Sequence, residues 1–326
     1  STPATPSIAP LGPTSDNTPT INGTAPANSA VQIYDANNNL IGTTNADANG
    51  NWSFTPTAPL ADGSYQLNAK ATDAYGNTSP ASTPTSLVID TTPPAKPLIT
   101  AVGPDNGPST TDKITSAKVL TITGTAEANS TVSVYDNGVL LGTATAGSNG
   151  SWSFTTISLA DGTNSFTAVA TDAVGNRSAT SDPAAMVIDS TAPAAPVINP
   201  LSSPNGDSTP ILSGKGEPGA TVTIYDGSTA IGSAVVDASG NWSFTPSSPI
   251  ADGSHSFTAN QKDAAGNTSP TSNQVNATID STPPAAPVIT PPTGPTSDNT
   301  PTLSGTAEPN STIKIYEGTT LLGTAV

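Results

Sequence analysis

The residues of this sequence that could do chemistry are mostly carboxylates. Asp and Glu number 24 against 8 Lys and Arg, the net charge is −16, and there is no Cys. Without cysteine the chain can form neither a disulfide framework nor a thiolate metal site. Carboxylate oxygens do suit hard cations such as Ca²⁺. The acidic excess disfavours nucleic acid, whose phosphates require a basic surface, and it disfavours anionic membranes for the same reason.

Catalysis has little support in the sequence. The single histidine, His255, aligns with Tyr65 and Asn164 in other copies of an internal repeat. Because two of three copies lack it, we expect a structural histidine at the surface or at a strand edge. No nucleophile–base pair, glycine-rich phosphate loop or paired-carboxylate pocket can be built from the remaining residues. The sequence therefore predicts a protein that is not an enzyme.

The internal repeat is the main organising feature. Trp52, Trp152 and Trp242 each begin a W-S-F triplet, at intervals of roughly 90 to 100 residues. A matching segment ends at Tyr34, Tyr135, Tyr225 and Tyr316. The linker I-D-[ST]-T-x-P then sets boundaries that divide the chain into units 1–92, 93–191 and 192–282 and a partial unit, 283–326. The fourth copy stops about halfway through a unit, so we expect an excerpt of a longer array.

Short alternating runs between turn signals predict the strands of each unit. In the first unit they are expected at Pro6–Leu11, Pro19–Ala25, Ala30–Asp35, Leu40–Asn45, Trp52–Thr55, Ser64–Thr72 and Thr85–Asp90. Seven short strands without a helical period are typical of an immunoglobulin-like sandwich. Trp52 and Phe54 fall on one face, which predicts a core position for the W-S-F triplet. The predicted fold is all-β, with tandem seven-stranded immunoglobulin-like β-sandwiches in an extended rod.

Several motifs carry a resemblance to a known family. They are G-T-A-E-x-x-S-T-V-x-V-Y-D at Gly124–Asp136, then N-W-S-F, L-A-D-G, A-T-D-A-x-G-N and the linker D-[ST]-T-x-P-x-x-P. Together they resemble the bacterial Ig-like repeats of giant, biofilm-associated-protein-like surface adhesins, over essentially the whole chain. The resemblance implies a surface-exposed rod that projects a distal binding tip, with calcium stiffening its junctions.

Strand topology predicts where the carboxylates gather. In a seven-stranded sandwich the first loop, the fifth loop and the chain exit lie at the C-terminal pole, and the second and sixth loops lie at the other pole. Carboxylates from consecutive units should therefore converge at each short linker. They repel one another unless a cation lies between them, and Ca²⁺ accepts six to eight oxygen ligands. The sequence thus predicts Ca²⁺ at the junctions.

The candidate ligands follow from this placement. The first junction would use Asp16, Asp62, Asp90, Glu127 and Asp172. The second would use Asp105 or Asp112 with Asp161, Asp189, Glu217 and Asp263. The third would use Asp207, Asp252, Asp280 and Glu308. In the second unit an insertion from Asp105 to Lys118 leaves the choice of its first-loop ligand open.

Ordinary turn chemistry competes with calcium at several of these positions. Asp62, Asp161 and Asp252 precede Gly, which is a common turn signal. The D-A-x-G-N loops could also be turns in which Asp accepts local N–H groups. For Asp90, Asp189 and Asp280 the sequence favours calcium, because a linker before Pro has little evident structural need for a carboxylate. Asp35, Asp136 and Asp226 are interpreted as hairpin residues.

The leading functional prediction is a structural spacer of a large bacterial cell-surface or secreted adhesin, active in adhesion and biofilm formation. Its partners would be the neighbouring repeats and a host or neighbouring-cell surface, without nucleic acid or membrane insertion. Two alternatives stay open: modules that bind carbohydrate or host protein, and an accessory array of a secreted enzyme. Near-identical units and few exposed aromatic residues speak against a dedicated binding site.

Overall fold

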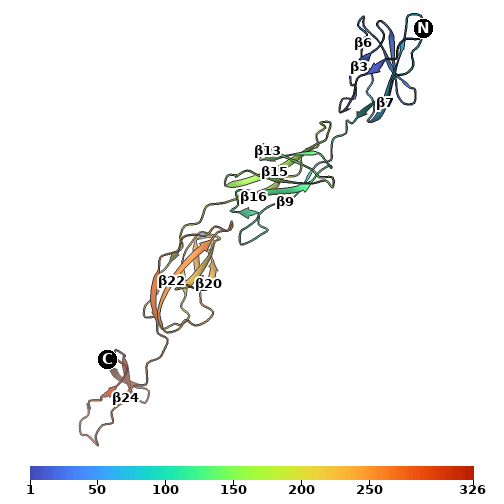
Figure 1. The fold of residues 1–326 in the computed structure, drawn as a ribbon. Helices are drawn as coiled ribbons and strands as arrows, with labels where there is room; N and C mark the ends of the chain where they lie inside the picture. The colour runs from blue at the N-terminus through green and yellow to red at the C-terminus, as the bar shows by residue number, and fades with distance from the viewer. The chain divides into compact units, whose positions relative to one another are not determined.

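The computed structural model describes all residues, 1–326. The chain is all-β and contains no helix, as the sequence predicts. Its internal contacts divide it into two compact units. The first unit is Ser1–Thr191 with Ala264–Gly266, and the second is Ala192–Asp263 with Asn267–Val326. Figure 1 shows the strands of both units, coloured from the N-terminus to the C-terminus.

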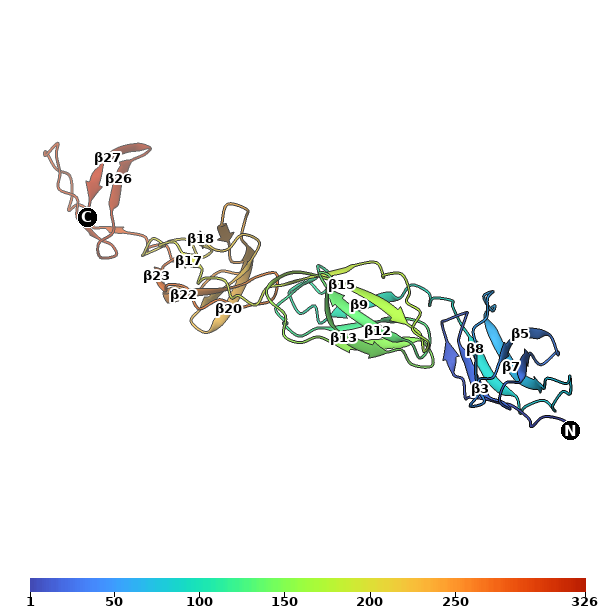
Figure 2. The same ribbon diagram turned by 90° about the horizontal axis from the view of Figure 1, so that it is seen from above.

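The first unit begins with a two-layered sandwich. Its strands are β1 (Ser7–Ile8), β2 (Pro13–Thr14), β3 (Ile21–Thr24), β4 (Ala30–Tyr34), β5 (Leu40–Asn45), β6 (Asn51–Phe54), β7 (Gly63–Thr72) and β8 (Thr85–Ile89). One layer has the order β1-β3-β6 and the other β2-β8-β7-β4-β5. Figure 2 shows β7 and β8 beside each other in the larger sheet.

The second sandwich of the first unit repeats this plan. Its strands are β9 (Leu98–Gly103), β10 (Ile114–Thr115), β11 (Thr121–Thr125), β12 (Thr131–Asp136), β13 (Val139–Thr145), β14 (Ser151–Thr155), β15 (Gly162–Thr171) and β16 (Ala184–Ile188). The layers have the orders β14-β11-β9 and β10-β16-β15-β12-β13.

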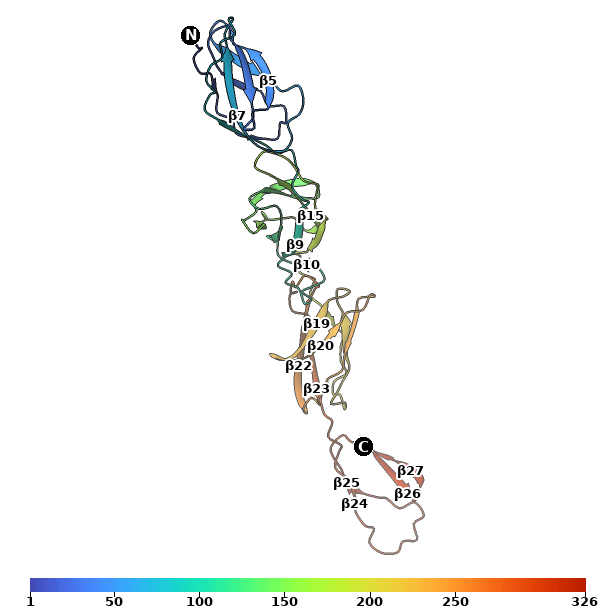
Figure 3. The same ribbon diagram turned by 90° about the vertical axis from the view of Figure 1, so that its right-hand side faces the viewer.

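The second unit contains a third sandwich and four further strands. The sandwich comprises β17 (Val197–Ile198), β18 (Leu212–Lys215), β19 (Thr221–Asp226), β20 (Thr229–Val235), β21 (Asn241–Phe244), β22 (Gly253–Lys262) and β23 (Val275–Ile279). Its sheets have the orders β17-β18-β21 and β20-β19-β22-β23, and Figure 3 shows the larger one. Two two-stranded sheets follow, made of β24 (Val288–Ile289), β25 (Gly305–Thr306), β26 (Ile313–Glu317) and β27 (Thr320–Ala325).

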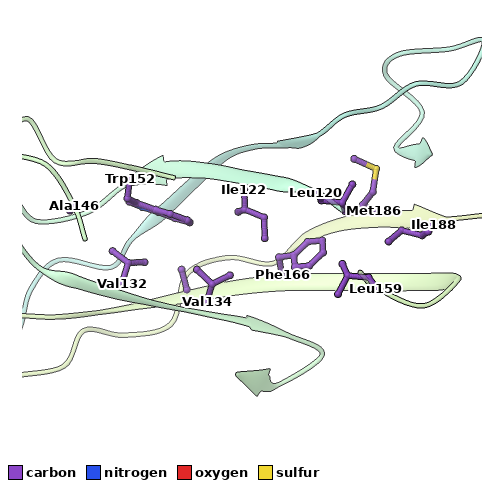
Figure 4. Close-up of a cluster of buried hydrophobic side chains, with 11 residues drawn as sticks. Leu120, Ile122, Val132, Val134, Ala146, Trp152, Leu159, Phe166, Met186 and Ile188 are labelled. Carbon is purple, nitrogen blue, oxygen red and sulfur yellow. The ribbon is translucent and has the colours of Figure 1, made fainter. Parts of the chain in front are cut away.

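Alternation along each strand builds the cores. In β4 the side chains of Val31 and Ile33 are fully buried, whereas Gln32 between them points to the other face. The close-up in Figure 4 shows the equivalent second core, where Trp152 of β14 and Phe166 of β15 lie between the two layers. Trp52, Trp152 and Trp242 are all at most 4% exposed, which confirms the prediction that the W-S-F triplet anchors the core.

A glycine on the neighbouring strand makes room for each tryptophan ring. Gly23, Gly124 and Gly214 each pair with the Trp of the neighbouring strand. A Cβ at any of these glycines would overlap that Trp ring and a carbonyl oxygen of the strand on the other side. The small side chain is therefore required by space, since the ring occupies the volume where a methyl group would lie.

The first predicted strand divides into two. One strand is predicted at Pro6–Leu11, but β1 ends at Ile8 and the chain continues as β2 in the other sheet. There β2 pairs in parallel with β8, through Pro13 with Val88 and Thr14 with Ile89. β10 pairs with β16 in the same way in the second sandwich. A two-residue strand has no alternation to detect, so the pattern gave no signal for it.

The contact between Gly23 and Trp52 can be tested by substitution. We expect Gly23→Ala to lower the free energy of unfolding of the first sandwich by about 2 kcal/mol, because the added methyl overpacks the core. Gly12→Ala is the matched control, since nothing lies within 4 Å of a methyl at that position. Denaturant-dependent hydrogen exchange, followed in peptides of the first sandwich, measures both. An equal loss in the two variants would contradict the packing argument.

Candidate functional site: carboxylates at the chain exits

In the first sandwich, the carboxylate of Asp62 binds the first residues of the following linker. Asp62 lies in the loop between β6 and β7, directly before the glycine that begins β7. Its Oδ1 accepts hydrogen bonds from the backbone N–H of Thr91 (3.0 Å) and from Thr91 Oγ1 (2.7 Å). Its Oδ2 accepts a bond from Thr92 Oγ1 at 2.7 Å. We call this arrangement, which holds the chain as it leaves β8, the exit clamp.

The exit clamp recurs in the second sandwich. The hydroxyl group of Ser190 donates to Asp161, with distances of 2.9 Å to Oδ1 and 3.0 Å to Oδ2. The backbone N–H of Ser190 and the hydroxyl of Thr191 donate to Oδ2 at 3.2 and 3.3 Å. Lys118 Nζ adds an ion pair at 3.3 Å from Asp161 Oδ1. Because both groups of that pair are solvent-accessible, it contributes little beside the hydrogen bonds.

In the third sandwich the clamp lowers the pKa of its carboxyl group strongly. Asp252 Oδ1 accepts bonds from Ser281 N (2.8 Å) and Ser281 Oγ (2.7 Å), and Oδ2 accepts one from Thr282 Oγ1. These bonds favour the charged form, first that from Thr282 and then those from Ser281, and they lower the pKa of Asp252 from its usual 3.8 to about 2. Hydrogen bonds from the linker hydroxyl groups also lower the pKa of Asp62 and of Asp161.

The aspartates that end the last strands also bind their own main chain. Asp90 Oδ1 accepts a hydrogen bond from Thr92 N at 3.1 Å, and Asp189 Oδ1 accepts one from Thr191 N at 3.0 Å. This is the Asx turn, in which a short carboxylate replaces a backbone acceptor. A carboxylate before the linker proline therefore has a structural role, which the sequence analysis did not anticipate. The backbone N–H of Asp280 donates to Asn205 O at 2.9 Å.

The D-A-x-G-N loops are closed by the same chemistry. Asp172 Oδ1 accepts bonds from the backbone N–H groups of Val174, Gly175 and Asn176, and Oδ2 accepts one from Asn176 Nδ2 at 2.8 Å. Burial opposes ionisation of Asp172, but these bonds outweigh it and lower its pKa. Asp263, which is 5% exposed, likewise binds the backbone and side-chain nitrogens of Asn267, both at 2.8 Å. These bonds are those of a turn closed by its own aspartate, which is the turn interpretation of the D-A-x-G-N loops.

The remaining predicted ligands lie in turns. Backbone N–H groups two residues later bind the Oδ1 atoms of Asp16, Asp112 and Asp207 at 2.9, 3.1 and 2.8 Å. Asp105 Oδ2 accepts a bond from Lys113 N at 3.1 Å, which closes the insertion of the second sandwich. The main-chain carbonyl groups of Glu127, Glu217 and Glu308 accept bonds from residues three positions later.

The structure brings few of the predicted ligands together. Within the first unit, Asn176 Nδ2 donates to the main-chain carbonyl of Asp90 at 2.8 Å, so the loop of Asp172 does reach the first linker. In the structure, which describes the whole chain, no group of three or more His, Asp or Glu side chains is arranged to hold a metal ion. Calcium at the junctions therefore stays a prediction.

His255 belongs to a second charged arrangement. Its Nδ1 lies 2.7 Å from Asp226 Oδ2, and its Nε2 lies 2.8 Å from the carbonyl oxygen of Ala251. The side chain is 15% exposed, so His255 is partly buried at the surface, and it lies on β22, which has a neighbouring strand on each side. Burial alone would lower the pKa of His255, but Asp226 and the carbonyl group outweigh it and raise the pKa. In the first sandwich Tyr65 makes the equivalent bond, from its hydroxyl group to Ala61 O at 2.8 Å.

A family model matches this repeated architecture. Residues 12–91, 93–190 and 205–281 each match the model of the bacterial Ig-like domain, and together the matches cover more than half of the chain. The chain belongs to the bacterial Ig-like domain family. Each of the three matched stretches contains one W-S-F triplet and one clamp aspartate. The chain has no helix long and apolar enough to pass through a membrane.

Several solved structures are similar to these bacterial Ig-like domains. A tetra-tandem repeat in the extending region of a large adhesion protein is 25% identical, with a TM-score of 0.30, over 88% of this chain and 76% of that chain. The BSP domain of a biofilm-associated protein is 14% identical (TM-score 0.24; 85% and 67% covered). Fibronectin(III)-like modules of Clostridium thermocellum CbhA are 17% identical (TM-score 0.35; 56% and 94% covered). No curated protein matches the chain.

The exit clamp should be visible as acid sensitivity of the third bacterial Ig-like domain. Because the pKa of Asp252 is lowered to about 2, its stabilisation is complete above pH 4 and is lost as the pH falls through about 2. We expect Asp252→Asn to lower the thermal midpoint of this domain at neutral pH and to flatten its acid profile. Asp207→Asn is the control, because both bonds of Asp207 use one oxygen, which an amide retains. Identical acid profiles for wild type and Asp252→Asn would refute the clamp.

His255 should make the thermal stability of the third domain depend on pH near neutrality. Both ring nitrogens face acceptors, so the charged imidazolium satisfies both. Because the folded-state pKa is raised, this stabilisation is complete below pH 6.5 and is lost as the pH rises through the folded pKa. We expect the thermal midpoint of the third domain to fall between pH 6 and pH 8. We expect His255→Tyr, which introduces the residue that the first domain has at this position, to remove the pH dependence. If the pH dependence persists in that variant, another group causes it.

Proposed function

We propose that this chain is a spacer segment of a bacterial surface or secreted adhesin, in which tandem bacterial Ig-like domains set the reach of a distal binding part. The observation that carries the proposal is the exit clamp, repeated in all three complete sandwiches. A spacer requires each domain to release the chain along a fixed direction. The clamp fixes that direction through hydrogen bonds between groups of one domain and the linker that follows it. Because it needs no specific partner, the same arrangement can be repeated along the chain.

The surface chemistry agrees with a spacer. A net charge of −16 keeps a long polar chain solvated and disfavours association between copies. The charged residues that make specific bonds direct them mainly to turns, linkers and their own main chain. Among the aromatic side chains, Tyr75 stands out at 92% exposed, and a single ring does not form a platform for a sugar or a protein. The geometry therefore supports a structural role in preference to a binding module.

Calcium is the second part of this proposal. The clamp oxygens of Asp62 are occupied by hydroxyl and N–H groups, so a cation would have to displace those bonds or use other oxygens. Two levels of linker control follow. The clamp fixes the first linker residues in the absence of a metal ion, and Ca²⁺ would add a further restraint where acidic loops of consecutive domains face one another.

Solution scattering of the full chain with Ca²⁺ and with a chelator tests the calcium part. If calcium stiffens the junctions, the maximum dimension should rise and the flexibility should fall on adding Ca²⁺, by mass action on the folded, bound state. An unchanged profile would remove calcium from the proposal.

Two substitutions of Asp189 separate calcium binding from the turn that Asp189 closes. Asp189→Asn keeps an oxygen for the bond to Thr191 N but removes the charge that a cation requires, whereas Asp189→Ala removes both. If calcium acts there, both variants should lose the response to Ca²⁺ at the second junction. If only the turn matters, Asp189→Ala alone should loosen the linker, with and without calcium. The spacer proposal itself fails if the chain without calcium shows fully flexible linkers despite intact clamps.

A further inference from the structure

The D-A-x-G-N loop is built in the same way in all three sandwiches. The three loops are Asp73–Asn77, Asp172–Asn176 and Asp263–Asn267, and each lies between the long strand and the last strand of its sandwich. In each loop the aspartate accepts hydrogen bonds from the backbone N–H and the side-chain amide of the asparagine. These bonds hold the loop closed and leave its third residue at the tip.

The tips of the three loops differ in exposure. Tyr75 of the first loop is 92% exposed, Val174 of the second is partly buried, and Ala265 of the third is 0% exposed. Because the loops share their internal hydrogen bonds and their place in the fold, this difference arises from what each tip contacts outside its own loop.

The second loop contacts the chain exit of the first sandwich. Asn176 Nδ2 donates one hydrogen to Asp172 Oδ2 and one to the main-chain carbonyl of Asp90, both at 2.8 Å. Asp90 directly follows β8 and directly precedes the linker residues that the exit clamp holds. Both hydrogens of this amide are therefore used, one inside the loop and one on the preceding domain. In the exposed first loop, Asn77 Nδ2 bonds Asp73 Oδ2 alone.

The tip of the third loop, Ala264–Gly266, belongs to the first unit of the chain, where it contacts the insertion of the second sandwich. The N–H of Ser116 donates to the carbonyl of Ala265 at 3.1 Å. A Cβ at Gly107 would lie 2.1 Å from the carbonyl oxygen of Ala264. Main chain therefore packs directly against main chain at this tip, which the small size of Gly107 permits.

Both contacts lie at the chain exit of a bacterial Ig-like domain. Asp90 is the exit residue of the first domain. Ser116 follows Thr115, whose carbonyl accepts the N–H of Asp189, the first residue after the last strand of the second domain. The partner groups are main-chain groups in both cases, and every copy presents such groups whatever its side chains. The tip of a D-A-x-G-N loop therefore fits the exit end of a domain of this family.

We propose that the Asp73–Asn77 loop is a docking surface for the chain exit of another bacterial Ig-like domain, one that precedes it in the same polypeptide. Asn77 Nδ2 donates its second hydrogen to the main-chain carbonyl that ends the last strand of that domain, and the linker of that domain covers the Tyr75 ring. Recognition lies in the amide and the main chain of the loop, to which the ring adds apolar contact area.

The docking is a property of the loop, whereas its use in a rod rests on the spacer function proposed above. The exit clamps act within each domain and its own linker. A loop that does not dock would therefore leave the spacer proposal standing.

The contact at Asp90 tests the role of the amide in the full chain. Spin labels are placed on the first two domains through Ser53→Cys and Ser153→Cys, the exposed serines of two W-S-F triplets in a chain without cysteine. We expect Asn176→Ala to raise the undocked part of the distance distribution about five-fold, the effect of one net hydrogen bond. Asn77→Ala is the matched control, because it removes the same bond inside a loop and no bond to an exit. Equal broadening by both variants, or none by Asn176→Ala, would overturn the docking role of the amide.

Extension of the chain tests the open surface. A second copy of residues 1–92, carrying Tyr75→Phe, is joined before Ser1 of the full chain, so that only the inner loop keeps its tyrosine. Iodination followed by peptide mass spectrometry measures the exposure of the inner Tyr75, with the half-exposed Tyr316 as internal reference. We expect the iodination rate of Tyr75 to fall at least about five-fold on extension, because one net hydrogen bond leaves only that undocked fraction reactive. The rate should recover when the inner loop carries Asn77→Ala.

Two results would overturn the proposal. An iodination rate that extension leaves unchanged would show that the loop does not dock on a bacterial Ig-like domain and would leave it to a partner of another kind. A rate that falls equally with and without Asn77→Ala would assign the shielding of Tyr75 to the nearness of the added domain alone.

Discussion

The hydrogen bonds that Asp62, Asp161 and Asp252 accept from the linkers are the interaction on which the ends of these domains depend. Bonds to an ionised carboxylate are shorter and stronger than neutral ones, and each of these carboxylates accepts at least three from two consecutive residues. They fix the linker immediately beyond the last strand. That strand is itself hydrogen-bonded to the long strand of its sheet. The direction in which each domain releases the chain is therefore set inside that domain.

The cores of these domains are small, and polar bonds supplement them. A composition with 4% aromatic residues leaves one Trp and few other aromatic rings between the layers of each sandwich, and a glycine on the paired strand makes room for each Trp ring. Small cores bury little apolar surface, so the specificity of turns and ends depends on polar bonds. Aspartates provide many of them: at the linker, in the D-A-x-G-N loop, in the turns that begin at Asp16, Asp112 and Asp207 and, through Asp226, beside His255. Much of the acidic excess that first suggested metal binding thus serves the main chain of the protein.

The sequence pattern predicted the all-β fold, the core role of the W-S-F triplet and the strands with clear alternation, because periodicity two and internal repetition are strong signals. It missed β2 and β10, since a two-residue strand has no period. It did not show that His255 pairs with Asp226, because comparing copies shows which residue varies and does not show what that residue contacts. The sequence singled out Asp62, Asp161 and Asp252 as ligands for a cation, whereas in the structure their partners are the hydroxyl and N–H groups of the D-[ST]-T linker. That signal was present in the motif itself, where Ser and Thr follow Asp in every copy, and could have been interpreted as a capping pattern.

Amide hydrogen exchange at Thr91, Ser190 and Ser281, measured on the full chain in the presence of a chelator, tests the central claim most directly. These three N–H groups donate to the clamp carboxylates and to no metal-dependent partner. The clamp predicts that all three amides are protected without calcium, at levels close to those of the last strands. Exchange at the rate of an unfolded linker, or protection that develops only after Ca²⁺ is added, would contradict it.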